Sequence, residues 1–336
     1  MRIDRQNVPC SVSDLTPEWI QLHIDEEYDF SDFGIERIGE DYGFASEIYR
    51  VRLNSVRNIV VKFWNAEKLH SDKELYFYEQ FGECISIQIP RCYYAGLDFD
   101  KRRAVLVLEA FEGCLQGDVL TGTNIGAWKD IACTLGTFHS QFWDSPNLQF
   151  EWINPRIVAR DVEWIVSRRE KLISLHESKI GRLTSTMLDR LPKMYQESVR
   201  FLELLPSTLL HSDLHLDNIL FTPVENETVI LDWANITRGP GVLDFIAICP
   251  QVGNMSNYFD IANSYLEALN SDEMKISSEE FNVQIKHAIV IAFVSNTLGI
   301  VNWTPDSERE AKIIDQCFER AELLADLLLD PQHYMD

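Results

Sequence analysis

The chain has few basic residues for its size, and it has no basic patch. Its 336 residues include 30 Lys and Arg against 53 Asp and Glu, which gives a net charge of −23 at pH 7. The densest basic runs are only Lys101-Arg102-Arg103 and Arg168-Arg169. Because so negative a field repels a phosphate backbone, we expect no nucleic-acid partner.

Cysteine pairs and long apolar runs are also missing. The 7 cysteines are scattered and form no CxxC pair, so the sequence predicts neither a disulfide framework nor a zinc knuckle. The longest apolar run, residues 288–301, is broken by Ser295, Asn296 and Thr297, which favours a buried helix over a membrane span. Residues 1–7 lack the apolar core of a signal peptide. We therefore expect a soluble, cytoplasmic protein with no membrane partner.

The composition that remains is that of a folded protein, with 46% hydrophobic and 11% aromatic residues. Thr16 followed by Pro17 predicts the start of a short helix. Five runs in the first third are typical of strands, and a helical pattern lies between the third and the fourth. The predicted strands are 35–38, 47–53, 58–63, 91–95 and 104–108, and the predicted helix is 66–82. These elements predict an antiparallel sheet with one inserted helix.

The pattern changes after Gly117, where helical periodicity dominates. A short β-rich stretch at 219–221 and 229–232 interrupts the predicted helices, which are 124–142, 160–176, 181–204, 256–269, 278–302 and 306–329. The sequence therefore predicts an α+β, two-lobed fold. We expect the lobes at 1–110 and 118–336, with a hinge at 111–117.

The strongest motif runs from His211 to Asn218, with the spacing H-x-D-x-x-x-x-N, and is followed by an apolar run that ends at Asp232. This order is used by protein-kinase-like phosphotransferases. Phosphoryl transfer needs hard oxygen ligands for Mg²⁺, which Asn218 and Asp232 can supply. Asp213 can accept the proton of an attacking hydroxyl group. The motif therefore predicts a kinase site.

Two other interpretations of this stretch stay open. His211, Asp213 and His215 alternate along the chain and could be metal ligands on one face of a strand, which would suggest a metallohydrolase. That interpretation leaves Asn218 and Asp232 unexplained. An ordinary polar loop beside a buried strand is the other alternative.

A nucleotide clamp is expected upstream of this motif. Lys62 ends an apolar strand, as expected for the lysine that pairs with ATP phosphates, and Glu74 is the preferred partner for it on the following helix, with Glu79 as the alternative. The loop at 38–46 offers Gly43 and Ser46 for close approach to phosphate, although an ordinary hairpin loop has the same pattern.

The end of the sheet is the second predicted part of the clamp. Residues 105–111 close the predicted sheet where a hinge would hold adenine through backbone groups. Glu109 and Phe111 mark the position of this hinge.

The chain resembles the aminoglycoside phosphotransferase and choline kinase-like family, which has a protein-kinase-like fold. The resembling motifs lie between Gly39 and Asp244 and include residues 44–49, 61–64, 135–143, 211–218 and 232–233. Several of them are similar to those of the ecdysteroid kinase-like branch. The family usually has Gly where Ser212 stands, and the loop at 38–46 is longer and more acidic than a plain Gly-rich loop.

The resemblance implies specific roles. It makes Asp213 the catalytic base, Asn218 and Asp232 the Mg²⁺ ligands, and Lys62 with Glu74 the ATP-phosphate pair. It also implies that the first lobe binds ATP and that the second lobe contains the catalytic loop and the acceptor site. We expect His139 to be a buried, hydrogen-bonded histidine, His211 to brace the loop, and Asp244 to be a structural carboxylate.

The acceptor is predicted from charge alone. Residues 1–110 carry a net charge of −7 and the remainder carries −16. A cleft lined with carboxylates would favour a cationic, hydroxylated small molecule such as an amino sugar or a choline-like amine. A solvated acidic surface unrelated to the site explains the same charge. A kinase of a neutral sterol, sugar or macrolide and a nucleotide-binding pseudokinase therefore stay open. The sequence does not predict the oligomeric state.

Overall fold

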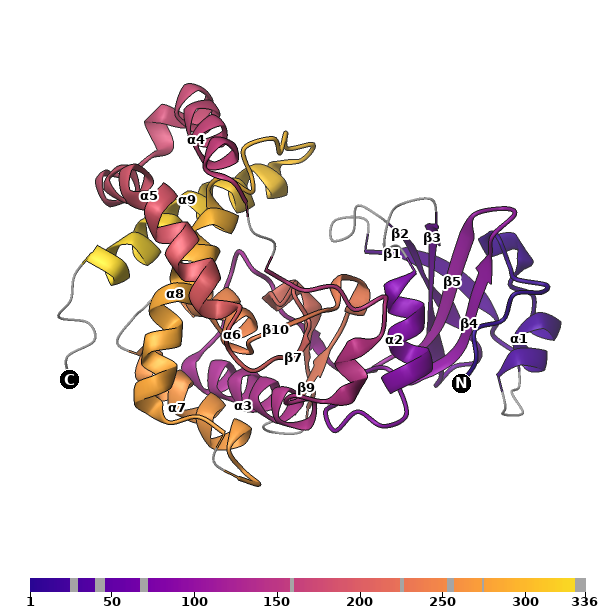
Figure 1. Cartoon of the computed structure of the whole chain (residues 1–336). Coiled ribbons are helices and arrows are strands. Elements are labelled where there is room, and N and C mark those ends of the chain that lie inside the picture. The colour runs from indigo at the N-terminus through magenta and orange to yellow at the C-terminus, as the bar shows by residue number, and fades with distance from the viewer. Residues whose placement is uncertain are drawn as a thin grey trace. The chain divides into compact units, whose positions relative to one another are not determined.

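The computed structural model describes residues 1–24, 30–39, 46–66, 72–157, 160–223, 227–252, 257–273 and 275–329 (Figure 1). The chain divides into two compact units. The first consists of residues 1–116 and 217–236, and the second of residues 117–216 and 237–336. The first unit is rich in β-structure and the second is mainly helical, so the predicted α+β class is confirmed.

The first unit is built on an antiparallel sheet whose strand order is β1-β2-β3-β5-β4. Its strands are β1 (Gly34–Ile38), β2 (Ser46–Arg52), β3 (Asn58–Asn65), β4 (Cys92–Asp98) and β5 (Arg103–Glu109). Helix α2 (Lys73–Phe81) lies between β3 and β4 in the chain. All five predicted strands and the inserted helix are therefore present, and the ends of the strands differ from the prediction by at most a few residues. The predicted start of the helix is not compared in this way, because residues 67–71 lie outside the described residues.

Alternation along β3 explains how the sheet forms its core. Ile59, Val61 and Phe63 have no exposed surface and pack in one cluster with the segment before the sheet. That segment contributes Val8, Leu15, Ile20 and Ile24 to the cluster. Lys62 points to the other face because successive side chains of a strand alternate. One face of the sheet is thus closed by the N-terminal segment, and the other carries the lysine.

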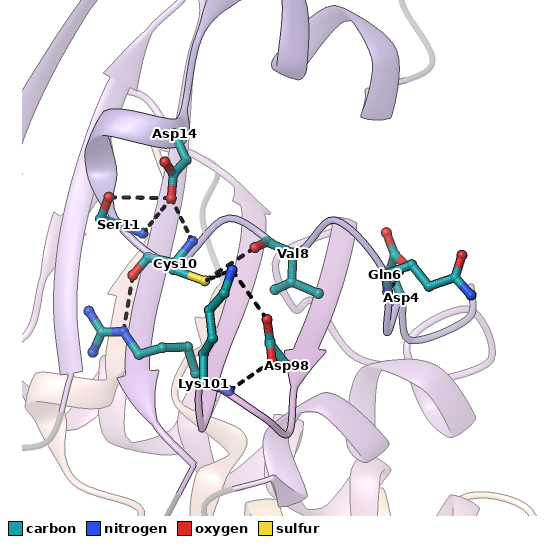
Figure 2. Close-up of polar contacts among 9 residues, drawn as sticks. Asp4, Gln6, Val8, Cys10, Ser11, Asp14, Asp98 and Lys101 are labelled. Carbon is teal, nitrogen blue, oxygen red and sulfur yellow. Dashed lines mark hydrogen bonds and ion pairs between the residues drawn. The ribbon is translucent and has the colours of Figure 1, made fainter.

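The N-terminal segment is attached to the sheet by polar contacts as well as by its apolar side chains. As predicted, Thr16 caps helix α1 (Pro17–His23), since its Oγ1 accepts a hydrogen bond from the N–H of Trp19. Figure 2 shows Cys10, whose sulfur lies 3.4 Å from Nζ of Lys101 in the turn between β4 and β5. The same figure shows the Cys10 N–H donating to Asp14.

A second, smaller sheet completes the first unit. It has the order β6-β8-β9 and consists of β6 (Leu115–Gln116), β8 (Ile219–Phe221) and β9 (Thr228–Ile230). The β8–β9 hairpin pairs Ile219 with Ile230, so the residue before β8 and the residues after β9 lie at the same end of the hairpin. This pairing places the predicted ligands Asn218 and Asp232 in the first unit.

The second unit is mainly helical. Its helices are α3 (Ile125–Gln141), α4 (Val162–His176), α5 (Arg182–Leu202), α6 (Val242–Ile248), α7 (Tyr258–Leu269), α8 (Ser278–Asn296) and α9 (Glu308–Leu329). Six of them were predicted, and α6 was not. The prediction was wrong for the end of α8, which stops at Asn296 rather than at 302. The pair β7 (Thr208–Leu210) and β10 (Thr237–Gly239) was also not predicted.

Within the described part of the chain, no helix is both long enough and apolar enough to cross a membrane. The apolar run at 288–301 falls largely in α8, where Ala288, Ile289 and Phe293 have no exposed surface. The interpretation of this run as a buried helix is therefore confirmed for its helical part.

Candidate active site

The predicted lysine of the first unit lies between two carboxylates. Lys62 Nζ is 2.7 Å from Oε2 of Glu74 on α2 and 2.9 Å from Oδ1 of Asp232. Burial alone would lower the pKa of Lys62, but the negative charges of Glu74 and Asp232 and the hydrogen bonds to them raise it above its ordinary value. The lysine is therefore a fixed cation, and the structure brings it together with two residues that the sequence singled out.

The two carboxylates differ in exposure. The Glu74 side chain is 2% exposed, whereas the Asp232 side chain is 42% exposed. Glu74 also accepts a hydrogen bond from the backbone N–H of Trp233. The Glu74 carboxylate is thus occupied by its contacts with Lys62 and Trp233, whereas the Asp232 carboxylate is accessible to a ligand.

Asn218 lies close in the fold to the residues that lead to Asp232. The backbone carbonyl of Asn218 accepts a hydrogen bond from the N–H of Leu231 at 2.9 Å, at the end of the β8–β9 hairpin. One amide and one carboxylate therefore stand at the same hairpin end. Both are hard oxygen donors, which is the chemistry that Mg²⁺ prefers.

The remaining clamp residues are spread along the sheet. Ser46 begins β2, two positions before Ile48, the register partner of Lys62. Glu109 ends β5 opposite Ile59, three positions from Lys62 along β3, which corresponds to about 10 Å.

Glu109 itself exchanges hydrogen bonds with Arg91, accepting from its N–H and donating its own N–H to the Arg91 carbonyl. The structure places Phe111 after the end of β5, partly exposed. The predicted Gly43 lies outside the described residues. Proximity to Lys62 is thus found for Glu74 and Asp232, whereas Glu109 belongs to the far end of the strand.

The predicted catalytic loop belongs to the second unit and follows β7. Asp244 on α6 accepts hydrogen bonds from the backbone N–H groups of His211 at 2.6 Å and Ser212 at 3.0 Å. Ser212 takes a left-handed conformation with φ +69°. Because that conformation favours glycine, it explains physically why Gly is usual at this position. Asp213 is the next residue, and its side chain is 47% exposed.

A buried polar cluster surrounds Asp244. His139 on α3 has no exposed surface, and its Nε2 lies 3.5 Å from Oδ2 of Asp244. The other ring nitrogen of His139 is 2.8 Å from the hydroxyl of Tyr265 on α7. Burial acts to raise the pKa of Asp244, but the proximity and charge of His139 and the N–H of Ser212 bring it below its ordinary value. Asp244 is therefore a buried carboxylate that stays ionised.

These contacts test the structural roles predicted from the sequence. His139 is confirmed as a buried, hydrogen-bonded histidine. His211 is confirmed as a brace, since its Nδ1 accepts a hydrogen bond from the N–H of Asp213 at 3.3 Å. Asp244 is confirmed as structural, although it holds the loop at 211–212 across the unit rather than the segment that leads into its own helix.

The sequence predicted no role for Lys73, and Trp233 was only part of the motif at 232–233. The Trp233 ring stacks on Phe77 of α2 with 4.3 Å between ring centroids, and Lys73 donates a hydrogen bond to the backbone carbonyl of Ile236. The only sequence signal for Lys73 is a charged residue four positions before Phe77, on an otherwise apolar face of the helix.

The interpretation of His211, Asp213 and His215 as metal ligands gains no support. His211 has no exposed surface and its Nδ1 is engaged by the Asp213 backbone. Across the ranges that the structure describes, no group of three or more His, Cys, Asp or Glu side chains is arranged to hold a metal ion.

Comparisons with known proteins agree with the motif. The family model of the phosphotransferase enzyme family matches residues 35–272, well over half of the chain. No curated protein matches the sequence.

Three solved structures illustrate the likeness in fold. A protein of Ralstonia eutropha JMP134, assigned by name to the aminoglycoside phosphotransferases, has a TM-score of 0.59 and 15% identity, with 93% of this chain and 96% of that chain covered. Spectinomycin phosphotransferase APH(9)-Ia, in complex with ADP and spectinomycin, has a TM-score of 0.55 and 15% identity, with 94% and 97% covered. A microcompartment-associated aminopropanol kinase has a TM-score of 0.53 and 14% identity, with 93% and 96% covered. The predicted kinase-like fold is confirmed by this likeness.

Proposed function

The chain belongs to the phosphotransferase enzyme family, and on this basis we propose that it transfers the γ-phosphate of ATP to a hydroxyl group of a small cationic acceptor. The family confirms the predicted enzyme class, a phosphotransferase with an alcohol group as acceptor. The observation that carries the proposal is the cluster of Lys62, Glu74 and Asp232, in which a fixed cation stands beside a half-exposed carboxylate.

Lys62 is suited to bind nucleotide phosphate. It stays positively charged because two carboxylates face it. Glu74 holds it from the buried side, so the ammonium cannot turn away from the exposed side of the cluster. A nucleotide as the phosphate donor is also in keeping with the ADP that is bound to the structurally similar spectinomycin phosphotransferase.

Asn218 and Asp232 fit the requirements of Mg²⁺. The ion typically takes one or two protein oxygens and completes its coordination with phosphates and water, so a donor pair is sufficient. The half-exposed carboxylate of Asp232 and the amide of Asn218, at one end of the β8–β9 hairpin, provide such a pair. When bound, Mg²⁺ would neutralise phosphate charge. In this proposal, Asn218 and Asp232 hold the ion, and Lys62 binds phosphate directly.

Asp213 is proposed to accept the proton of the acceptor hydroxyl. The backbone of its loop is fixed by Asp244, which binds two consecutive N–H groups, while the Asp213 side chain stays half-exposed. A rigid backbone with an exposed carboxylate is what a general base requires, because the base must meet the hydroxyl in a defined position. Four residues of chain separate Asp213 from Asn218, so one motif supplies both the proposed base and a proposed metal ligand.

The proposed acceptor follows from the charge of the chain. The net charge is −23, and residues 111–336 contribute −16 of it. Such a field raises the local concentration of cations, which favours an amino sugar or a choline-like amine over a neutral sterol, sugar or macrolide.

The test is ADP release from Mg²⁺-ATP in the presence of single acceptors, namely aminoglycosides, choline, amino sugars, macrolides and sterols. We expect release that depends on a cationic acceptor and that Asp213→Asn abolishes while ATP binding persists. Release with neutral acceptors only would refute the cationic acceptor. Full turnover by Asp213→Asn would remove Asp213 from the role of base. ATP binding without release for any acceptor would favour the pseudokinase alternative.

A further inference from the structure

The turn that follows Asp232 is attached to α2 by three side chains. Lys73, Glu74 and Phe77 are 5%, 2% and 0% exposed, respectively. Phe77 stacks on the ring of Trp233 with an angle of 8° between the ring planes, and Glu74 accepts the N–H of Trp233. Lys73 lies on the same helix face as Phe77, four residues earlier. The turn is therefore held along its length by one helix.

Lys73 reaches the far end of the turn. Its Nζ donates a hydrogen bond to the backbone carbonyl of Ile236 at 2.8 Å. Burial lowers the pKa of Lys73, and the charge of Asp72 acts in the opposite direction. A buried ammonium group is tolerated only where acceptors replace its water, so the bond to Ile236 is part of what keeps this lysine inside.

The conformation of Asp232 shows why the far end of the turn matters. Asp232 has φ +58° and ψ +72°, a left-handed conformation that is uncommon for residues other than glycine, although aspartate adopts it more often than most. Such a residue keeps its conformation only where the surrounding structure fixes it from more than one side. Lys62 fixes the Asp232 carboxylate at 2.9 Å, and Lys73 fixes the carbonyl of Ile236 four residues later.

We propose that Lys73 is a positioning residue of the metal and nucleotide site. By holding the Ile236 carbonyl, it keeps Asp232 in the left-handed conformation that presents its half-exposed carboxylate to Mg²⁺. This inference rests on the proposed function, because it takes Asp232 as a ligand of the ion. A lysine that only stabilises the fold would leave the metal affinity of the folded protein unchanged.

The experiment measures metal binding directly. Mn²⁺ replaces Mg²⁺ as the probe, and its binding to the full chain in the presence of ADP is followed by electron paramagnetic resonance. Lys73→Met keeps the length and the apolar stem of the side chain but removes the donor, whereas Lys73→Arg keeps a donor. Lys101→Met is the control, since it removes a positive charge from the same unit at a side chain that is 64% exposed. Folding is checked by circular dichroism, and ADP affinity is also measured with EDTA.

We expect Lys73→Met to bind Mn²⁺ about 10-fold more weakly than the wild type, as is usual when a group that orients a metal ligand is lost. Lys73→Arg should recover most of the affinity, and Lys101→Met should bind like the wild type. ADP affinity with EDTA should change by less than about twofold, because no metal is then involved. Wild-type Mn²⁺ affinity in folded Lys73→Met would overturn the inference. If Lys73→Met does not fold, Lys73→Leu, which also lacks a donor, takes its place and the same comparison with Lys73→Arg decides.

One further variant separates this inference from the proposed function. Asp232→Asn should lose Mn²⁺ binding in the presence of ADP. If Asp232→Asn binds Mn²⁺ like the wild type, the metal role of Asp232 fails, and the inference fails with it. If Asp232→Asn loses the ion while Lys73→Met retains it, the proposed function stands and only the role of Lys73 is wrong.

Discussion

Asp244→Asn is the substitution that most directly tests how the catalytic loop is held. The wild-type carboxylate is 2% exposed and accepts the N–H groups of His211 and Ser212, one on each oxygen. Asparagine has nearly the same shape, but it offers one acceptor oxygen and one NH₂ group. One backbone N–H therefore keeps an acceptor, while the other faces a second donor and has no water to replace the lost bond.

The size of the effect follows from these bonds. A hydrogen bond to a charged group contributes about 1.5–3 kcal/mol, and a buried donor left without an acceptor costs about 1–3 kcal/mol. His139, whose Nε2 is 3.5 Å from Oδ2, also loses its negative partner. We expect Asp244→Asn to lower the free energy of unfolding by about 2–4 kcal/mol, a large share of the 5–15 kcal/mol typical of a domain.

The assay is urea denaturation of both proteins between about pH 7 and pH 3. The pKa of Asp244 is lowered by folding from its ordinary value of 3.8. Its contribution is therefore complete above the unfolded pKa and is lost as the pH falls through the lower folded pKa. The part of the difference that depends on the Asp244 charge should thus shrink only below about pH 4. Asp272→Asn, at an exposed aspartate of the same unit, is the control.

Two results would refute the reasoning about Asp244. A loss of less than about 0.5 kcal/mol at neutral pH would show that the two backbone bonds do not depend on the negative charge. A difference that grows as the pH falls below about pH 4 would mean that the folded pKa of Asp244 is raised rather than lowered. If the prediction holds, the turnover number should also fall, since the loop carries Asp213, while ADP affinity stays unchanged.

The remaining predictions concern Glu74 and Ser212. Glu74→Gln keeps an acceptor for Lys62 but removes the negative charge that faces it. Because the ammonium group is then held less firmly, ADP affinity should fall about tenfold, or about 1.4 kcal/mol, in a calorimetric titration. An unchanged affinity would show that Asp232 alone fixes the lysine. Ser212→Gly should be more stable than Ser212→Ala by about 1 kcal/mol in urea denaturation, because both lose the hydroxyl that contacts Thr237 but only glycine accepts φ +69° without strain. Equal stabilities would contradict strain at Ser212.

Much of the fold could be predicted because its elements have local signals. Strand β3 follows from the apolar run at 58–63, and Thr16 with Pro17 marks the start of α1. The elements that were not predicted depend on distant partners. Strand β7 and strand β10 have three residues each and exist because they pair with one another. Helix α6 is seven residues long and almost wholly buried, so it has no polar face to give a helical period.

The same distinction applies to the site. The residues that we propose to act on a ligand have a signal in the sequence, because the chemistry of phosphoryl transfer demands particular side chains at particular spacings, as at Asp213 and Asp232. The particular contacts that hold them could not be predicted, because any donor or acceptor at the right place in space is sufficient. Lys73 contacts the carbonyl of a residue 163 positions away, and Asp244 contacts the N–H of a residue 33 positions away. No spacing in the sequence indicates such contacts.

Both parts of the candidate site solve one physical problem in the same way. The two half-exposed carboxylates are those of Asp232 and Asp213. Asp232 is itself in the left-handed conformation, and Asp213 directly follows Ser212, which has that conformation too. Each of these turns is held by a carboxylate that is 2% exposed and accepts a backbone N–H within it, Glu74 in one case and Asp244 in the other. Because an exposed carboxylate cannot supply the bonds that keep its own backbone in place, the buried acid is the part that holds the exposed one in position.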